Sequence, residues 1–167
     1  GRVLYNGVPY GELERPIATI GAALDASAHP GRTARNHLRT MCAASGLPSS
    51  RADDVLAEVG ISTVADQRVG GFSLGMRQRL ALAGALLGEP ETLLLDEPAN
   101  GLDPDGIRWL RSYLRGYAER GGAVFVSSHL IAELALFADD LVVIGAGCLL
   151  AAATHRALPT HRWGVCE

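Results

Sequence analysis

The stretch LLLDEP at residues 93–98 limits what this chain can fold into more than any other stretch. Thr92 to Leu95 is a short apolar run between Pro90 and a turn, and such a run predicts a buried strand. Asp96 and Glu97 then place two carboxylates at the carboxyl end of that strand, where open α/β sheets bind their ligands. One acid can hold Mg²⁺ through water, and the next can orient an attacking water. A strand that ends in two solvated acids is the simpler interpretation, so the flanking sequence must decide.

The residues that follow predict a second strand beside the first. Asp103 and Pro104 are a typical N-cap and first residue of a helix. A glycine pair and an apolar run at 123–127 come after that helix. A strand, a helix and a strand joined by short turns make the two strands parallel neighbours. Asp96 and His129 are therefore expected at the same edge of one sheet, where the histidine can reach a bound phosphate.

A third informative stretch, FSLGM at residues 72–76, lies upstream of the acids. A glycine-rich loop leads into a helix whose apolar residues recur every three or four positions. Ser73 is predicted to be the N-cap of this helix. Free backbone N–H groups at such a helix start attract anions, although most capped helices after glycine-rich loops bind nothing.

The remaining elements are predicted from shorter signals, namely the breakers and capping residues that bound each segment. They are a strand and an Asn-Gly hairpin turn at residues 1–7, a strand at 17–24 followed by Asp25, a helix at 34–45 capped by Thr33, a helix that Ser50 caps and Gly60 ends, and a hairpin at 140–151. The helices between residues 25 and 71 are expected to form a small helical insert on a core that contains the sheet.

Composition excludes several classes of protein. A chain of 167 residues is the size of one domain. The net charge of −3 and pI near 6.0 disfavour a general nucleic-acid binder. The sequence has no run of 18 apolar residues, and its three cysteines lack metal-ligand spacing, which fits a reducing compartment. All 15 basic residues other than histidine are arginine, so the chain has no lysine.

Taken together, the order and spacing of these stretches closely resemble the ATP-binding subunit of ABC transporters. The residues at 72–76 correspond to the family's signature motif, usually LSGGQ, and those at 93–96 to its Walker B strand. Glu97 matches the catalytic glutamate, residues 101–104 match the D-loop, and His129 matches the switch histidine. The resemblance covers about residues 1–151. Leucine and methionine in the signature are most common among bacterial exporter-type members.

The resemblance implies a fold and a function. The fold is an α/β, P-loop NTPase-like ABC ATPase core, a parallel sheet with flanking helices. A helical subdomain at about residues 26–90 is inserted in it, and a divergent tail follows at 152–167. The function implied is ATP hydrolysis that powers membrane transport, with ATP and Mg²⁺ bound. The implied partners are a second ABC ATPase domain and a transmembrane permease, which would hold the protein at the cytoplasmic face of the membrane.

The resemblance also assigns roles to individual residues. Asp96 would hold Mg²⁺ through water, Glu97 would polarise the attacking water, and His129 would contact the γ-phosphate. ATP held by one subunit would be contacted by residues of the other, namely Ser73, Leu74, Gly75, Met76 and Asp103.

Two features depart from the family pattern. The phosphate-binding GxxxxGK[ST] motif is absent because the chain has no lysine. The family places that motif upstream of the first strand, so the chain is expected to be truncated at its N-terminus and inactive alone. Asp25 occupies the position of the Q-loop glutamine, where a carboxylate can coordinate Mg²⁺ but cannot donate a hydrogen bond.

Two alternative functions remain. The chain could be a catalytically inactive remnant that binds no nucleotide. It could also come from an ABC ATPase that does not serve transport, as in chromosome maintenance. Such relatives insert long coiled coils before the signature, and the absence of heptads between Asp25 and Ser73 favours transport.

Overall fold

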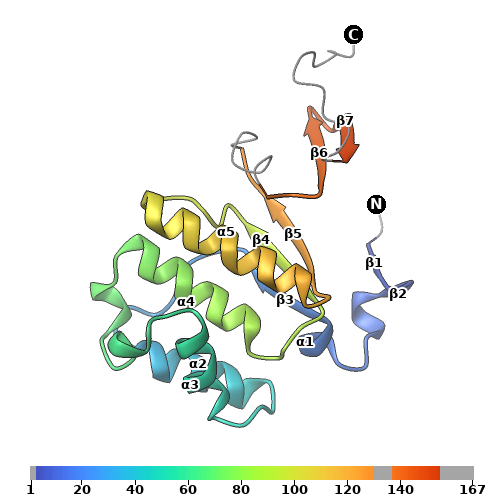
Figure 1. The fold of residues 1–167 in the computed structure, drawn as a ribbon. Coiled ribbons are helices and arrows are strands. Elements are labelled where there is room, and N and C mark those ends of the chain that lie inside the picture. Colours follow the sequence, from blue (N-terminus) through green and yellow to red (C-terminus); the bar gives the residue numbers. More distant parts are fainter. Residues whose placement is uncertain (1–2, 130–136, 155–167) are drawn as a thin grey trace. The chain divides into compact units, whose positions relative to one another are not determined.

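The computed structural model describes residues 3–129 and 137–154. The described residues fall into two compact units, the first ending at Ser127 and the second beginning at Ser128. Figure 1 shows helices packed on a small sheet in the first unit and a β-hairpin in the second. No helix among the described residues has both the length and the apolar character needed to cross a membrane.

A three-stranded parallel sheet organises the described part of the first unit. Its strands are, in spatial order, β3 (Ile20–Ala23), β4 (Thr92–Asp96) and β5 (Ala123–Ser127). Ala23 pairs with Leu95 and Asp96 with Ser127, so the carboxyl ends of the strands meet at one edge. The predicted parallel strand–helix–strand unit is therefore confirmed.

One face of this sheet is covered by α4 (Leu74–Leu86) and α5 (Pro104–Glu119), as Figure 1 shows. Leu93 and Leu95 of β4 point to that face and are fully or almost fully buried. A Cβ atom at Gly21 of β3 would lie 2.1 Å from the backbone oxygen of Ala85. Glycine at this position therefore lets α4 lie directly against the sheet.

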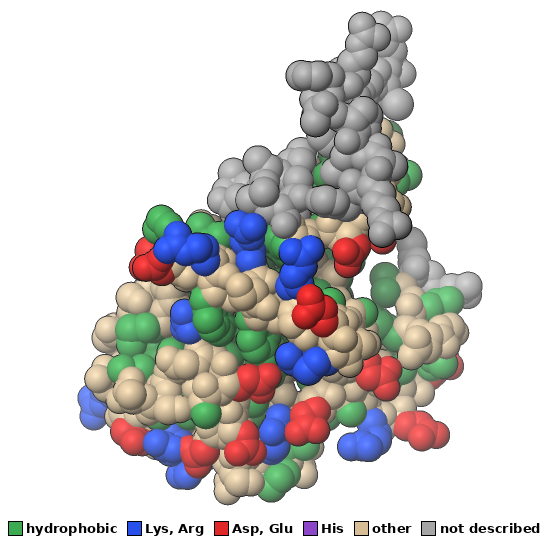
Figure 2. Space-filling view, viewed as in Figure 1, with side chains coloured by type: hydrophobic (Ala, Val, Ile, Leu, Met, Phe, Trp, Pro, Cys, Tyr) green, Lys and Arg blue, Asp and Glu red, His purple; other side chains and the backbone are tan. Residues whose placement is uncertain are grey.

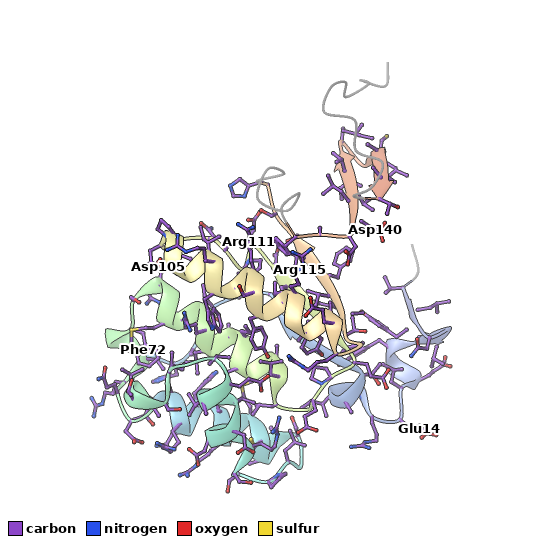
Figure 3. The ribbon with its side chains drawn as sticks, viewed as in Figure 1. Glu14, Phe72, Asp105, Arg111, Arg115 and Asp140 are labelled. Carbon is purple, nitrogen blue, oxygen red and sulfur yellow. The ribbon has the colours of Figure 1, made fainter. Side chains whose placement is uncertain are left out.

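Helix α5 is amphipathic, and its sequence explains where it begins and ends. The Asp103 carboxylate accepts a hydrogen bond from Gly106 N at 2.7 Å, and Pro104 is the first helical residue. Leu110 and Leu114 are buried on the side that faces the sheet. Figure 2 shows positive side chains gathered over the outer side of this helix, and Figure 3 shows Arg111 and Arg115 pointing away from it.

The helices between β3 and α4 are α2 (Ala34–Ala44) and α3 (Arg51–Glu58), close to the predicted bounds. Thr33 caps α2 as predicted, because its hydroxyl accepts a hydrogen bond from Asn36 N at 3.2 Å. Ser50 occupies the predicted N-cap position of α3, but its side chain does not cap the helix. Ser50 has helical backbone angles and makes no side-chain capping bond, and its backbone oxygen instead accepts from Asp53 N. Short 3-10 turns follow at Ser62–Val64 and Val69–Gly71.

The strand predicted at 17–24 is only half correct, since its first part is the short helix α1 (Pro16–Thr19) and only Ile20–Ala23 is β3. Pro16 favours a helix start, and Arg15 O accepts hydrogen bonds from the N–H groups of Ala18 and Thr19. The β-branched residues of this segment suggested a strand, but these local hydrogen bonds outweigh that preference.

Both predicted hairpins are present in the described residues. Strands β1 (Leu4–Tyr5) and β2 (Val8–Pro9) are joined by Asn6 and Gly7, whose φ angles of 51° and 83° suit a tight hairpin turn. The 3-10 turn Tyr10–Glu12 follows. In the second unit, β6 (Asp140–Gly145) pairs antiparallel with β7 (Cys148–Thr154). The tail predicted to diverge lies, from residue 155 onward, outside the described residues.

Candidate active site

The two acids that organise the sequence lie at the carboxyl end of β4, and β5 holds them in place. The Ser127 hydroxyl donates a hydrogen bond to Asp96 Oδ1. The backbone N–H of Glu97 donates to Ser127 O at 3.1 Å and lies 3.3 Å from its hydroxyl oxygen. Asp96 is exposed and Glu97 is half-buried. Ser127 was not among the sequence-predicted site residues, although its place at the end of the neighbouring strand was predicted.

Glu97 has a backbone conformation that non-glycine residues seldom adopt. Its φ angle is 45°, in the left-handed region, which costs about 1–3 kcal/mol for such a residue. Its backbone oxygen accepts a hydrogen bond from Asn100 N at 3.1 Å, which closes the turn after the strand. The two bonds from Glu97 N to Ser127 help to offset the strain. A carboxylate kept at a strand end in this conformation is a candidate for a catalytic role.

The helix start at the signature position has the predicted cap. The Ser73 hydroxyl accepts a hydrogen bond from Met76 N at 3.2 Å, and α4 begins at Leu74. Ser73 and Leu74 are exposed, while Gly75 and Met76 are half-exposed. The hydroxyl and the first backbone N–H groups of a 13-residue helix are thus accessible to an anionic ligand.

The structure brings the signature residues and the turn before α5 into contact, which sequence reasoning missed. A Cβ atom at Gly101 would lie 2.0 Å from Leu74 Cδ2. A Cβ atom at Gly75 would lie 3.2 Å from Leu102 Cδ2. Gly101 also has a φ angle of 70°, which favours glycine. The glycines at 75 and 101 were visible signals of a close approach, but the sequence does not say what approaches them.

A small, mainly apolar hollow lies where α4 and α5 meet the ends of β3 and β4. Its lining includes Ala23, Gln78, Leu82, Leu95, Leu102 and Trp109. The strand ends, the signature helix and the turn before α5 therefore all contribute to one small region of the first unit.

Asp25 lies two residues beyond β3, at the same edge of the sheet as Asp96, and it is exposed. The described residues contain no group of three or more His, Cys, Asp or Glu side chains that could hold a metal ion by itself. Mg²⁺ in nucleotide-hydrolysing proteins is held by one or two carboxylates together with substrate phosphates. Among the described residues, the bond from Ser127 uses only Oδ1 of Asp96, so Oδ2 can take another ligand. Asp96 therefore fits this use of Mg²⁺.

His129 lies two residues beyond the end of β5, in the second unit. Its predicted place next to the acids remains a prediction.

Comparison with known proteins places the chain in a family. The family model described as ABC transporter matches residues 1–100, more than half of the chain, and the chain belongs to this family. It is 46% identical over 106 residues to an uncharacterized ABC transporter ATP-binding protein, YhcH, of Bacillus subtilis. That match covers 63% of this chain and 35% of the relative.

Two further relatives are transport proteins by name. The bacitracin transport ATP-binding protein BcrA of Bacillus licheniformis is 44% identical over 120 residues, which are 71% of this chain and 39% of BcrA. The lantibiotic transport ATP-binding protein SrtF of Streptococcus pyogenes is 30% identical over 151 residues, which are 90% of this chain and 65% of SrtF. The chain thus spans between about a third and two thirds of the length of these relatives.

Solved structures agree with the fold. An ATP-binding subunit of an ABC transporter matches with a TM-score of 0.74 at 24% identity, over 89% of this chain and 65% of that one. CbiO1 from Clostridium perfringens, described as part of the ABC transporter complex cbiONQ, matches with a TM-score of 0.76 at 25% identity. That match covers 93% of this chain and 66% of cbiO1. The predicted α/β fold, a parallel sheet with flanking helices, is confirmed.

Proposed function

We propose that this chain is part of the ATP-binding and ATP-hydrolysing subunit of an ABC-type membrane transporter that works as an exporter. The observation that carries the proposal is the end of β4, where Asp96 and the strained Glu97 are both hydrogen-bonded to Ser127. Membership of the ABC transporter family supports it, and the names of BcrA and SrtF refer to transport. The exporter assignment rests on Leu74 and Met76 in the signature.

The proposed site residues divide the chemistry among them. Asp96 would hold Mg²⁺ through a water molecule, with Asp25 as a second acid at the same edge of the sheet. The ion supplies positive charge that offsets the charge of the phosphates. Glu97 orients the attacking water and accepts its proton, and His129 contacts the γ-phosphate. Positioning and charge stabilisation supply most of the rate in phosphoryl transfer.

The signature residues act on the nucleotide of a second ATPase domain. The first turn of α4 contains no acidic residue, and its start offers a hydroxyl and backbone N–H groups, which suit a phosphate. The ATP-contacting residues are Ser73, Leu74, Gly75 and Met76, with Asp103 bridging the two sites. ATP-driven dimerisation then moves a transmembrane permease, which holds the subunit at the cytoplasmic face of the cell membrane.

The proposed domain organisation is a partial ABC ATPase domain at residues 1–151 and a divergent tail at 152–167. The helical subdomain spans about residues 26–90. Helices α2 and α3 lie in this range and pack through buried residues such as Leu38, Cys42, Val55 and Leu56, which supports a helical insert with its own small core.

The 167 residues alone are expected not to hydrolyse ATP. ATP brings several negative charges to a region that already holds Asp96 and Glu97, and the chain has no lysine to offset them. A helix start contributes only about 0.3–1 kcal/mol to anion binding at an exposed site. Mg²⁺-dependent turnover by the 167-residue chain that disappears in Glu97→Gln would contradict this expectation.

The trans role of the signature is tested in what we term the extended protein, residues 1–167 preceded by a segment that carries GxxxxGK[ST]. The Ser73→Arg variant should bind ATP as a monomer with unchanged affinity, since Ser73 contacts nucleotide held by the other subunit. Its hydrolysis and dimer closure should be lost. Ser49→Arg, at an exposed serine outside the site, is the matched control. Parental turnover by Ser73→Arg would show that the assignment is wrong.

A further inference from the structure

Among the described residues, only the Arg79 side chain makes both a cation–π contact with α5 and a hydrogen bond with the end of α3. It lies on α4, six residues after Ser73, and is half-buried. Its Nη1 donates a hydrogen bond to the backbone oxygen of Val59 at 2.7 Å. Its Cζ lies 3.7 Å from the centre of the Trp109 ring. One guanidinium group thus joins α3, α4 and α5.

The contact with α3 satisfies a group that would otherwise lack a partner. Val59 follows the last residue of α3, and the final carbonyl groups of a helix have no partners within it. The Val59 side chain is fully buried, so water has little access to this region. Gly60 turns the chain away with a φ angle of 73°, and a Cβ atom there would lie 3.2 Å from Arg79 Nη1. The turn therefore leaves room for the guanidinium.

A second set of contacts joins α3 and α5. The Trp109 ring stacks on the Tyr113 ring, with centres 5.6 Å apart and planes inclined by 24°. The Tyr113 hydroxyl donates a hydrogen bond of 2.6 Å to Glu58 Oε1. Glu58 and Val59, adjacent at the end of α3, are thus both tied to α5, one through Tyr113 and one through Arg79.

The charge of Arg79 also interacts with a carboxylate at the start of α5. Burial lowers the pKa of the Arg79 guanidinium, and the Asp103 carboxylate opposes that shift. Asp103 is the N-cap of α5, six residues before Trp109. The contacts of Arg79 therefore run from the end of α3 to the first two turns of α5.

We propose that Arg79 is a positioning residue that couples the end of α3 to the first two turns of α5. The coupling itself depends only on the contacts above, and its consequence for hydrolysis rests on the proposed function. A displacement of α3 moves the Val59 carbonyl, Arg79 follows it, and Trp109 transmits the movement along α5. The position of Asp103, which would bridge two ATP sites, is thereby tied to the position of the helical insert.

The coupling is tested by hydrogen exchange of single backbone amides in the extended protein without nucleotide. Arg79→Gln removes the charged donor to the Val59 carbonyl, so amide exchange near Gly60 should become faster. At a distance, exchange of the Gly106 amide should also become about tenfold faster. Arg77→Gln makes the same change on the same helix, at an arginine whose side chain makes no hydrogen bond, ion pair or ring contact with the described residues, and it should change the exchange of the Gly106 amide less than about twofold. Faster exchange confined to residues near Gly60 would overturn the proposal.

A milder variant keeps the test decisive if Arg79→Gln does not fold. Tyr113→Phe removes only the hydroxyl that bonds Glu58 and keeps the ring that stacks on Trp109. It should raise Gly106 exchange about threefold, and unchanged exchange at Gly106 would again overturn the coupling.

The consequence for hydrolysis is read from steady-state kinetics of the extended protein. Arg79→Gln should lower kcat about tenfold and leave the KM for ATP within about twofold, because Arg79 is not one of the residues that we propose to bind ATP. Arg79→Lys, which keeps the charge, should recover part of the loss. Faster Gly106 exchange with an unchanged kcat would overturn the link to the ATP site. An extended protein with no ATPase activity would contradict the proposed function, while the exchange data would still decide the coupling.

Discussion

The carboxyl ends of β3 and β4 are neighbours in one sheet, yet the chain leaves them in different ways. After β4, Asp96 is hydrogen-bonded to Ser127, and Glu97 turns the chain with a left-handed backbone. After β3, Leu24 is 65% exposed, Asp25 is exposed, and residues 25–29 have no regular secondary structure. Ala23 and Leu95 are register partners, so the difference arises from the residues that follow the strands.

The difference indicates that the two strand ends have different proposed roles. A residue that orients an attacking water needs a fixed geometry, and Glu97 has the hydrogen bonds and the strained turn that provide it. A residue that responds to a partner must be able to change position at low cost, and the exposed segment with Asp25 suits that task. The predictions below should separate the two strand ends, from the largest expected effect to the smallest.

The largest effect is expected at Glu97. In the extended protein, Glu97→Gln removes the proton acceptor but keeps the side-chain shape, so ATP turnover should fall by at least about a hundredfold. ATP should still bind, and the protein should accumulate as a closed dimer, measured by size-exclusion chromatography with Mg²⁺ and ATP. Glu91→Gln, an exposed glutamate just before β4, is the control and should keep parental turnover. Normal turnover by Glu97→Gln would remove Glu97 from the site.

The next effect is expected at Gly101, in the turn that follows Glu97. An alanine there would have its Cβ 2.0 Å from Leu74 Cδ2 and would also have to adopt a φ angle of 70°. We expect Gly101→Ala to lower the free energy of unfolding by about 1–3 kcal/mol, measured by urea denaturation. Gly11→Ala has no atom within 4 Å of its Cβ and serves as the control. Equal stability of the two variants would mean that the signature and the turn are not in close contact.

A smaller effect is expected at Ser127, which holds both acids. Ser127→Ala removes the hydroxyl that donates to Asp96 and lies near Glu97 N, but it keeps the backbone bond to Glu97. The free energy of unfolding should fall by about 1 kcal/mol, because the site is exposed to water. Turnover by the extended protein should fall by a larger factor than in Ser112→Ala, at an exposed serine of α5. Equal turnover in the two variants would deny Ser127 a role in placing the acids.

Local signals made much of the fold predictable from the sequence. Thr33, Ser73 and Asp103 cap helices as predicted, because a capping side chain needs only the N–H groups two or three residues later. The parallel pairing of β4 and β5 followed from strand–helix–strand connectivity.

The errors and omissions have identifiable causes. Ile17 to Thr19 are helical because hydrogen bonds to Arg15 O outweigh the strand preference of β-branched residues. The contact of Leu74 with Gly101 and the bonds of Ser127 join residues far apart in the chain. No periodicity or spacing encodes such contacts, so they had to come from the structure.

The smallest effect on stability is expected at Asp25. Because the residue is exposed and follows the strand in a segment without regular structure, Asp25→Ala should change the free energy of unfolding by less than about 0.5 kcal/mol. Asp25→Gln restores the family's usual residue, so the extended protein should keep or increase its ATP turnover. Asp25→Ala should instead weaken the stimulation of turnover by a permease partner. If that stimulation is unchanged, Asp25 has no part in the site, and the two strand ends differ more in function than we propose. If Asp25→Ala lowers the unfolding free energy as much as Ser127→Ala does, the two ends are equally fixed and the contrast between them is wrong.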